Sequence, residues 1–273
     1  MSAHTTFRIG GKADLFLKPA AEENLRGALL TARENDIPCF YLGGGSNLLV
    51  SDFGIHGAVI YTGGFSDLSL LECGAGARLS KLCSFALENS LSGCEFAWGI
   101  PGTVGGAVYM NAGAYGGEMK DVILSVRHMT PDGEIEEVPA ESLKLGYRSS
   151  VYSKNKNIIL SAKLKLHPGD KNEIREKMDD LIERRKEKQP IDMPSAGSTF
   201  KRPEGNFAGT LIEQCGLKGA SVGGAMVSEK HAGFIVNTGN ATCSEVLRLI
   251  EKVRDTVLEK SGVLLEPEVR VIK

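Results

Sequence analysis

Hydrophobic and polar positions along the chain follow two periods, one typical of strands and one typical of helices. Short apolar or alternating runs predict strands at residues 15–17, 38–42, 48–50, 57–61, 68–72, 122–129, 134–138, 158–166, 234–237 and 263–272. Apolar residues at helical spacing predict helices that include residues 25–32, 79–87, 170–189 and 246–257, and a short helix that ends near residue 216. Thr242 and Glu245 fit a capping box at the start of the helix that includes 246–257. The pattern therefore predicts strands and helices in mixed order.

Both periods are interrupted between residues 94 and 117, where glycines alternate with aromatic and aliphatic residues. Glycine lacks a Cβ atom and accepts positive φ, so such a segment lets backbone N–H groups approach a flat or anionic ligand closely. A buried glycine-rich turn between two strands is the alternative, and the segment alone does not separate the two interpretations.

A second glycine run, Gly43-Gly44-Gly45-Ser46-Asn47, follows the predicted strand 38–42 directly. Successive N–H groups in such a turn can bind an anion, and a diphosphate suits it well. A tight hairpin corner is the alternative. The chain contains neither G-x-G-x-x-G nor G-x-x-x-x-G-K-[ST], so no motif supports a Rossmann fold or a P-loop.

Composition narrows the class of protein. The chain has 273 residues, 42% hydrophobic residues, 24% charged residues and a formal net charge of -2, a balance without bias toward nucleic acid or an anionic membrane surface. Six cysteines and five histidines lack the spacing of a metal site, so no metal is expected. No apolar run resembles a signal peptide or a membrane span, and we expect a cytoplasmic protein.

Polar residues at three places in the chain lie in contexts that suit chemistry. Arg148, between Tyr147 and Ser149, fits the capture of a carboxylate or phosphate, although a surface arginine is the alternative. Ser198 follows a glycine in a loop rich in hydroxyl groups, and a capping loop is its alternative. Glu266 and Glu268 flank a proline in an apolar stretch, which predicts that one of them faces a site.

Taken in order, eight segments resemble the UDP-N-acetylenolpyruvoylglucosamine reductase family. The segments are TTFRIGG, YLGGGSNLLV, GAGARL, GIPGTVGGAVYMNAGAYG, GYRSS, AGSTFKRP, GLKGASVGGAMVSEKHAGFIVN and LEPEVR. The resemblance covers nearly the whole chain. It implies an α+β fold with a two-lobed FAD-binding domain of the vanillyl-alcohol-oxidase (PCMH) type, followed by a C-terminal α+β substrate-binding domain. The expected boundaries are 1–62 and 63–167 for the two FAD-binding lobes and 168–273 for the substrate-binding domain.

The resemblance also implies a cofactor and the residues that hold it. FAD is expected to bind non-covalently, because Ser46 stands where some relatives carry the histidine that attaches the flavin. NADPH is the expected co-substrate. The expected FAD-binding residues are Gly43, Gly44, Gly45, Ser46, Asn47, Gly74, Ala75, Gly76, Pro101, Gly102, Thr103, Gly105, Gly106, Asn111, Gly113 and Ala114.

The chemistry that the resemblance implies is reduction of an enolpyruvyl sugar nucleotide to UDP-N-acetylmuramate for peptidoglycan. Arg148 would bind the substrate carboxylate, Glu268 would stabilise or protonate the enolate-like intermediate, and Ser198 would deliver a proton to its α-carbon. Lys201 and Arg202 would meet the uridine diphosphate. The chain resembles the shorter type of the family, which lacks an insertion carrying a substrate-covering tyrosine, and we expect a monomer.

Two other functions are open to such a chain. Another flavin oxidase or dehydrogenase could use the same scaffold, but the resemblance extends through the segments that contain Ser198 and Glu268. A non-catalytic flavin or nucleotide-sugar binding protein would be expected to lack at least one of Arg148, Ser198 and Glu268, and all three are present.

Overall fold

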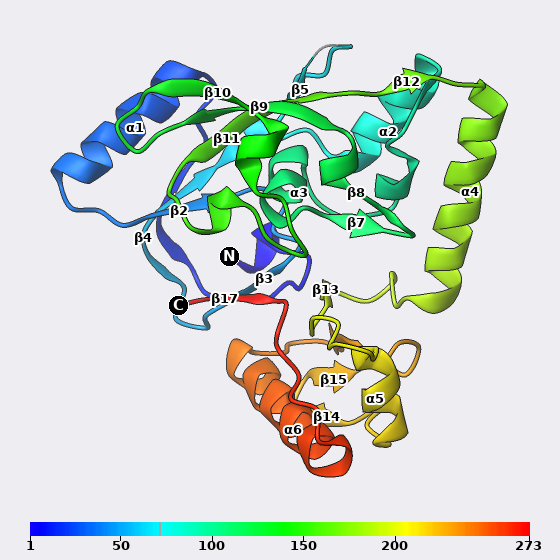
Figure 1. The fold of residues 1–273 in the computed structure, drawn as a ribbon. Helices are drawn as coiled ribbons and strands as arrows, with labels where there is room; N and C mark the ends of the chain where they lie inside the picture. The colour runs from blue at the N-terminus through cyan, green and yellow to red at the C-terminus, as the bar shows by residue number, and fades with distance from the viewer. Residues whose placement is uncertain (71) are drawn as a thin grey trace. The chain divides into compact units, whose positions relative to one another are not determined.

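The computed structural model describes residues 1–70 and 72–273 and divides the chain into two compact units (Figure 1). Unit 1 comprises residues 1–14, 45–56 and 185–273, and unit 2 comprises residues 15–44 and 57–184. These boundaries differ from the predicted ones, and the three-part division stays a prediction. Among the described residues, no helix is both long and apolar enough to cross a membrane.

Unit 2 is built on two sheets. One has the strand order β1-β4-β2 and the other has the order β10-β9-β11-β5. The strands are β1 (Ala13–Leu17), β2 (Cys39–Leu42), β4 (Ile55–Tyr61), β5 (Cys73–Gly74), β9 (Ile123–Met129), β10 (Ile135–Pro139) and β11 (Ile158–Leu164). Two short antiparallel pairs join β6 (Leu91–Ser92) to β12 (His167–Pro168) and β7 (Gly113–Ala114) to β8 (Gly117–Glu118).

The helices of unit 2 follow the predicted apolar spacing. They are α1 (Glu22–Glu34), α2 (Leu79–Glu88), α3 (Val104–Met110) and most of α4 (Lys171–Lys188). Helix α2 buries five side chains on one face, and these join a core that includes Val104 and Val108 of α3. Because α3 packs against β11, the glycine-rich segment is held directly on the second sheet (Figure 1).

Unit 1 contains the antiparallel sheet β13-β16-β15-β14 and the parallel pair β17-β3. The elements are β3 (Leu48–Val50), β13 (Ser195–Ser198), α5 (Ala208–Gln214), β14 (Ser221–Val222), β15 (Ala225–Val227), β16 (Phe234–Asn237), α6 (Cys243–Ser261) and β17 (Arg270–Ile272). Helix α6 packs against β14 and β15 and begins with the capping box that Thr242 and Glu245 predict. Its predicted inward residues are buried: Val246, Ile250, Val253 and Val257.

Short 3₁₀ helices connect these elements: η1 (Ser2–His4), η2 (Thr62–Gly64), η3 (Glu95–Ala97), η4 (Met119–Asp121), η5 (Ala140–Leu143) and η6 (Val151–Ser153). The glycine-rich segment 94–117, for which the sequence predicts no helix, contains both η3 and α3. Its valines and Ala107 place an apolar face in the core despite the flanking glycines.

Two predicted strands are wrong in part. In the predicted strand 68–72, Leu71 lies outside the described residues, Leu68 forms an isolated bridge with Cys73, and the Ser69 N–H donates to the Glu72 carbonyl, as in a turn. The predicted strand 263–272 is a strand only at residues 270–272, and Leu264, expected to be buried, is exposed. Pro267 interrupts this strand because it has no N–H for a ladder.

Candidate functional site

Two glycine segments of unit 2 approach each other backbone to backbone. A Cβ atom added to Gly44 would lie 2.8 Å from the Gly102 Cα, and one added to Gly43 would lie 2.8 Å from the Thr103 hydroxyl oxygen. Both distances are shorter than ordinary contacts allow, so only glycine fits here. The segment after β2 and the segment before α3, predicted separately, therefore form one surface.

The third predicted segment joins the same surface. The Gly105 N–H donates to the Ala75 carbonyl oxygen at 2.8 Å, and a Cβ on Gly105 would lie 2.8 Å from the Ala75 Cβ. We call the segments 43–44, 74–76 and 101–106 the glycine cradle. Its members come from three separate stretches of sequence, as the resemblance implies for a cofactor site.

One buried polar atom in the cradle fits a bound group. Thr103 is 4% exposed, and its hydroxyl has no hydrogen-bond partner among residues 1–70 and 72–273. This hydroxyl lies beside the Cβ positions of Gly43 and Gly106. Leaving a buried hydroxyl unpaired costs about 1–3 kcal/mol, and an oxygen-rich ligand such as the FAD diphosphate would supply the partner. The cradle therefore fits FAD.

The predicted cofactor residues beyond the cradle have other partners. Gly113 and Ala114 pair with β8, and a Cβ on Gly113 would lie 2.7 Å from the Gly117 oxygen. The Asn111 side chain is fully buried and makes hydrogen bonds to Glu118, Lys120 and Gly146. The polar atoms of the Asn111 side chain are therefore engaged by protein partners, and its role at the cofactor stays a prediction.

Arg148 lies at the tip of a tight turn in unit 2. Gly146 and Ser149 exchange two backbone hydrogen bonds, of 3.0 and 3.2 Å, so that Tyr147 and Arg148 are the two central residues. The Arg148 guanidinium lies 5.1 Å from the Tyr147 ring centroid. The turn is followed by η6, which the side chain of Tyr152 attaches to β9.

The anchor of η6 is the buried pair Tyr152 and His128, together with the exposed Glu136. The Tyr152 hydroxyl lies 2.9 Å from His128 Nδ1, and His128 Nε2 lies 3.2 Å from a Glu136 carboxylate oxygen. Burial raises the pKa of the Tyr152 hydroxyl, with a smaller contribution from the charge of Glu136. Because a carboxylate only accepts, His128 donates from Nε2 to Glu136.

The other predicted residues belong to unit 1. There the Asn47 side chain donates to the Glu268 carbonyl oxygen at 3.3 Å, and the Arg270 N–H donates to the Asn47 carbonyl oxygen at 3.0 Å. Gly45 also belongs to this unit, where a Cβ would lie 2.1 Å from the His4 oxygen. Asn47, the last residue of the predicted diphosphate segment, thus contacts the segment that carries Glu268.

The structure brings the Ser198 and Glu268 segments side by side. Ser198, at the end of β13, is exposed, and the next residue, Thr199, accepts the Glu268 N–H at 2.7 Å through its carbonyl oxygen. The buried Thr199 hydroxyl accepts the Ile235 N–H at 3.0 Å. This hydrogen bond holds the contact between the two segments on the sheet. No sequence pattern identifies Thr199, because only its position directly after Ser198 marks it.

Two cations follow on the same segment. The Lys201 ammonium pairs with the Glu266 carboxylate, and the Lys201 N–H donates to the Glu266 carbonyl oxygen at 2.8 Å. The exposed Arg202 guanidinium lies 4.5 Å from the Phe207 ring centroid. Glu266, one of the two acids noted in the sequence, is therefore a partner of Lys201, and Glu268 is the acid that lies beside Ser198.

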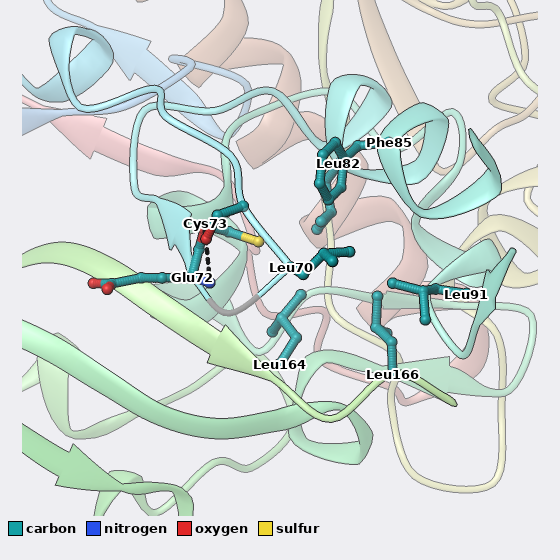
Figure 2. Close-up of a pocket in the computed structure, with 9 residues that line it drawn as sticks. Leu70, Glu72, Cys73, Leu82, Phe85, Leu91, Leu164 and Leu166 are labelled. Carbon is teal, nitrogen blue, oxygen red and sulfur yellow. Dashed lines mark hydrogen bonds between the residues drawn. The ribbon is translucent and has the colours of Figure 1, made fainter. Parts of the chain in front are cut away.

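Unit 2 also contains an apolar pocket (Figure 2). Leu82 and Phe85 of α2 face Leu164 and Leu166 across it, with Cys73 at one side. None of the predicted site residues lines this pocket. Within the part of the chain that the structure describes, no three His, Cys, Asp or Glu side chains are grouped so that they could hold a metal ion.

In comparisons with known proteins, the chain matches two family models and several full-length relatives. Residues 13–139 match the family model of an FAD binding domain, and residues 189–272 match that of the UDP-N-acetylenolpyruvoylglucosamine reductase C-terminal domain. The chain is 50% identical to the UDP-N-acetylenolpyruvoylglucosamine reductase of Syntrophomonas wolfei, with 100% of this chain and 93% of the relative covered. It is 50% identical to that of Exiguobacterium sibiricum, with 98% and 90% covered.

A solved structure is also similar over its whole length. The chain is 39% identical to the UDP-N-acetylenolpyruvylglucosamine reductase of Thermus caldophilus, with a TM-score of 0.88 and with 100% of this chain and 97% of that chain covered. These findings confirm the predicted fold class, an α+β chain with an FAD-binding domain followed by the C-terminal domain of this type.

Proposed function

The chain belongs to the family of UDP-N-acetylenolpyruvoylglucosamine reductases, and we propose that it reduces the enolpyruvyl group of UDP-N-acetylglucosamine enolpyruvate. The product is the lactyl ether of UDP-N-acetylmuramate, a peptidoglycan precursor, and NADPH is the reductant. The observation that carries this proposal is similarity over the entire chain, which includes both the FAD-binding match and the segments of Ser198 and Glu268.

FAD is the cofactor, and when bound it supplies the hydride chemistry that links NADPH to the substrate double bond. We propose that the glycine cradle holds it, with Gly45, Ser46 and Asn47 at the diphosphate. The unpartnered Thr103 hydroxyl supports this proposal, because it is a donor without an acceptor inside the cradle. The binding is non-covalent, since Ser46 offers no nucleophilic nitrogen for a bond to the flavin.

The remaining chemistry belongs to three side chains. Addition of hydride to the β-carbon of the enolpyruvyl group leaves enolate-like charge on the α-carbon and the carboxylate. Arg148 binds that carboxylate, because its planar guanidinium forms two parallel hydrogen bonds with it. Glu268 stabilises or protonates the intermediate, and Ser198 delivers the proton to the α-carbon. The hydrogen bond from the Glu268 N–H to the residue after Ser198 supports the joint action of these two.

Lys201 and Arg202 bind the uridine diphosphate of the substrate. Both cations lie within four residues of Ser198, so one segment presents the proton donor and the groups that hold the nucleotide. Lys201 is held in place by Glu266. An anionic ligand would compete with that carboxylate for the ammonium group.

We further propose that the protein works as a monomer in the cytoplasm, where NADPH and nucleotide sugars are available. The formal net charge of -2 supports the absence of nucleic acid or an anionic membrane as a partner. Light scattering of the purified protein at several concentrations tests the monomer, and a mass twice that of the chain would contradict it.

The experiment that tests the function uses purified protein with the enolpyruvyl sugar nucleotide and NADPH. We expect yellow protein that releases intact FAD on denaturation, and NADPH-dependent formation of UDP-N-acetylmuramate. A flavin oxidase of another type would consume NADPH without this product. A non-catalytic binding protein would bind the sugar nucleotide and leave NADPH unchanged. Either result would contradict the proposal.

A further inference from the structure

We propose that Asn111 is a positioning residue that holds the turn of Arg148 in its active conformation. The inference rests on the proposed function for the role of Arg148, but its structural part concerns only contacts within unit 2. It gives the Asn111 side chain a task other than binding the cofactor.

The turn needs to be held because its backbone conformation is unfavourable. Arg148 has φ of 52°, a left-handed conformation that residues with a Cβ atom adopt at a cost and that glycine or asparagine usually fills. Strain of this kind persists only where surrounding contacts fix the backbone. Two backbone hydrogen bonds between Gly146 and Ser149 close the turn but do not attach it to the rest of the unit.

Asn111 supplies the attachment. It ends α3 in the left-handed conformation, with φ of 43° and ψ of 54°, and its side chain is completely buried. Its Nδ2 donates to a Glu118 carboxylate oxygen at 2.6 Å and to the Gly146 carbonyl oxygen at 3.1 Å. The Lys120 N–H donates to its Oδ1 at 2.8 Å. A backbone N–H can only donate, so this contact fixes which end of the amide is oxygen and aims Nδ2 at the turn.

A second contact ties the other side of the turn to the same helix end. The buried Ser150 hydroxyl donates to the Tyr109 carbonyl oxygen at 2.7 Å. Tyr109 and Asn111 stand at the C-terminal end of α3, and Thr103 of the glycine cradle stands at its N-terminal end. The helix therefore links the proposed cofactor site to the proposed carboxylate-binding arginine, and a displacement of Asn111 would move Arg148 relative to the cradle.

The test uses two variants that separate the effect of the Asn111 side-chain amide from the effect of its backbone conformation. Asn111→Gly keeps the left-handed conformation and removes the amide. Asn111→Asp keeps the shape and the acceptor for Lys120 but loses the donor to Gly146 and to Glu118. A matched control is Asn237→Asp, because Asn237 is also buried, donates from Nδ2 to a carbonyl oxygen, that of Phe7, at 3.1 Å, and accepts two backbone N–H groups.

The first readout is amide hydrogen exchange of the FAD-loaded protein without substrate. We expect the N–H groups of Gly146 and Ser149 to exchange about tenfold faster in both Asn111 variants, the size of coupling common between contacting residues. The Asn237→Asp control should leave them unchanged. Unchanged exchange in the Asn111 variants would overturn the inference, whatever the enzyme does.

The second readout is a ratio of two rates in the same enzyme. Reoxidation of NADPH-reduced enzyme by the enolpyruvyl sugar nucleotide depends on Arg148, and reduction by NADPH has no proposed step at Arg148. We expect the Asn111 variants to slow reoxidation about tenfold more than reduction, and to cause no further slowing in an Arg148→Ala background. If the Asn111 variants slow reoxidation as much in the Arg148→Ala background as in the parent enzyme, Asn111 does not act through Arg148.

The two proposals fail in different ways. If the parent enzyme is not reoxidised by the sugar nucleotide, the proposed function fails, and the exchange data still decide whether Asn111 holds the turn. If Asn111→Asp does not fold, Ser150→Ala removes the second contact of the turn, and we expect the same pattern in exchange and in the rate ratio. Normal exchange in Ser150→Ala and in Asn111→Gly would overturn the inference.

Discussion

The glycine cradle of unit 2 and the Ser198–Glu268 segments of unit 1 represent two ways of building a site. The cradle consists of backbone, with glycines so close to neighbouring atoms that an added methyl group would lie 2.8 Å from Gly102 or from Thr103. At the second place an exposed serine at the end of β13 and a half-buried glutamate lie on two segments that backbone hydrogen bonds join. The space between backbone segments limits which residues the cradle can contain, whereas the function of the Ser198–Glu268 segments depends on the side chains that they carry.

The difference teaches where each site is sensitive. Adding atoms to the cradle should harm folding and cofactor binding together, because the backbone has no room to relax. Removing side-chain atoms from Ser198 or Glu268 should leave the fold intact and lower only the rate of the reaction. The predictions below test this contrast, beginning with the largest expected effect.

Ser198→Ala should lower turnover by about 10²–10⁴-fold, the range for loss of a proton donor, and should leave thermal stability unchanged within about 0.5 kcal/mol because the side chain is exposed. Stopped-flow absorbance should show normal bleaching of the flavin by NADPH and slow reoxidation by substrate. Ser195→Ala on the same strand is the control, with near-normal rates expected. Loss of flavin reduction in Ser198→Ala would show that the assigned role is wrong.

Gly44→Ala should destabilise the protein by about 1–3 kcal/mol, since overpacking costs this much, and should abolish tight FAD binding. Gly27→Ala is its matched control, because Gly27 lies inside α1 with nothing within 4 Å of the added Cβ. That change should stabilise by about 0.5–1 kcal/mol. Denaturant melts and a fluorescence titration with FAD measure both. Normal FAD affinity in Gly44→Ala would argue against the cradle.

Thr103→Val should have effects of opposite sign on the protein with and without its cofactor. Valine removes a buried hydroxyl that has no hydrogen-bond partner among residues 1–70 and 72–273. The change should therefore stabilise the FAD-free protein by about 1 kcal/mol. The same change should weaken FAD binding about fivefold to tenfold, equivalent to one hydrogen bond. Thermal melts of both forms and FAD titrations provide the measurement. Effects of the same sign would show that the hydroxyl has no role toward FAD.

Glu95 gives a pH-dependent contribution to unit 2. Burial would raise the pKa of this carboxyl group, but hydrogen bonds from Ser92 and Gly93 and the charge of Lys177 outweigh burial and hold it below the usual value. A lowered folded pKa stabilises the protein above the unfolded value of about 4.3 and loses this effect as pH falls through the folded value.

Glu95→Gln should therefore destabilise by about 1 kcal/mol at pH 7, and the difference from the parent should shrink below about pH 4. Urea melts between pH 3 and about pH 7 measure this trend. Exposed Glu141→Gln serves as a control for the loss of one charge. A difference that grows as the pH falls would contradict the assignment.

Local patterns were enough to predict much of the fold. The apolar faces of α2 and α6 and the capping box at Thr242 depend on near neighbours in sequence, and the structure confirms them. The helix within the glycine-rich segment was missed, because glycine and valine are weak helix formers and its apolar face is decided by tertiary packing.

The site could be predicted only as separate residues. Arg148, Ser198 and the pair Glu266 and Glu268 stand out by their local context. The family resemblance selects Glu268 and supplies the three roles, which remain proposals. The contacts that hold their segments join residues far apart in sequence, as Asn47 does with Glu268 and Asn111 with Gly146. An asparagine has no periodicity that reveals its partner, so such contacts could not be read from the sequence.

The central claim is that this chain transfers reducing equivalents to an enolpyruvyl sugar nucleotide. The most direct measurement adds that nucleotide, without oxygen, to enzyme already reduced by NADPH and follows the flavin absorbance. We predict rapid return of the oxidised spectrum with formation of one UDP-N-acetylmuramate per FAD. A flavin that stays reduced until oxygen is admitted would contradict the account.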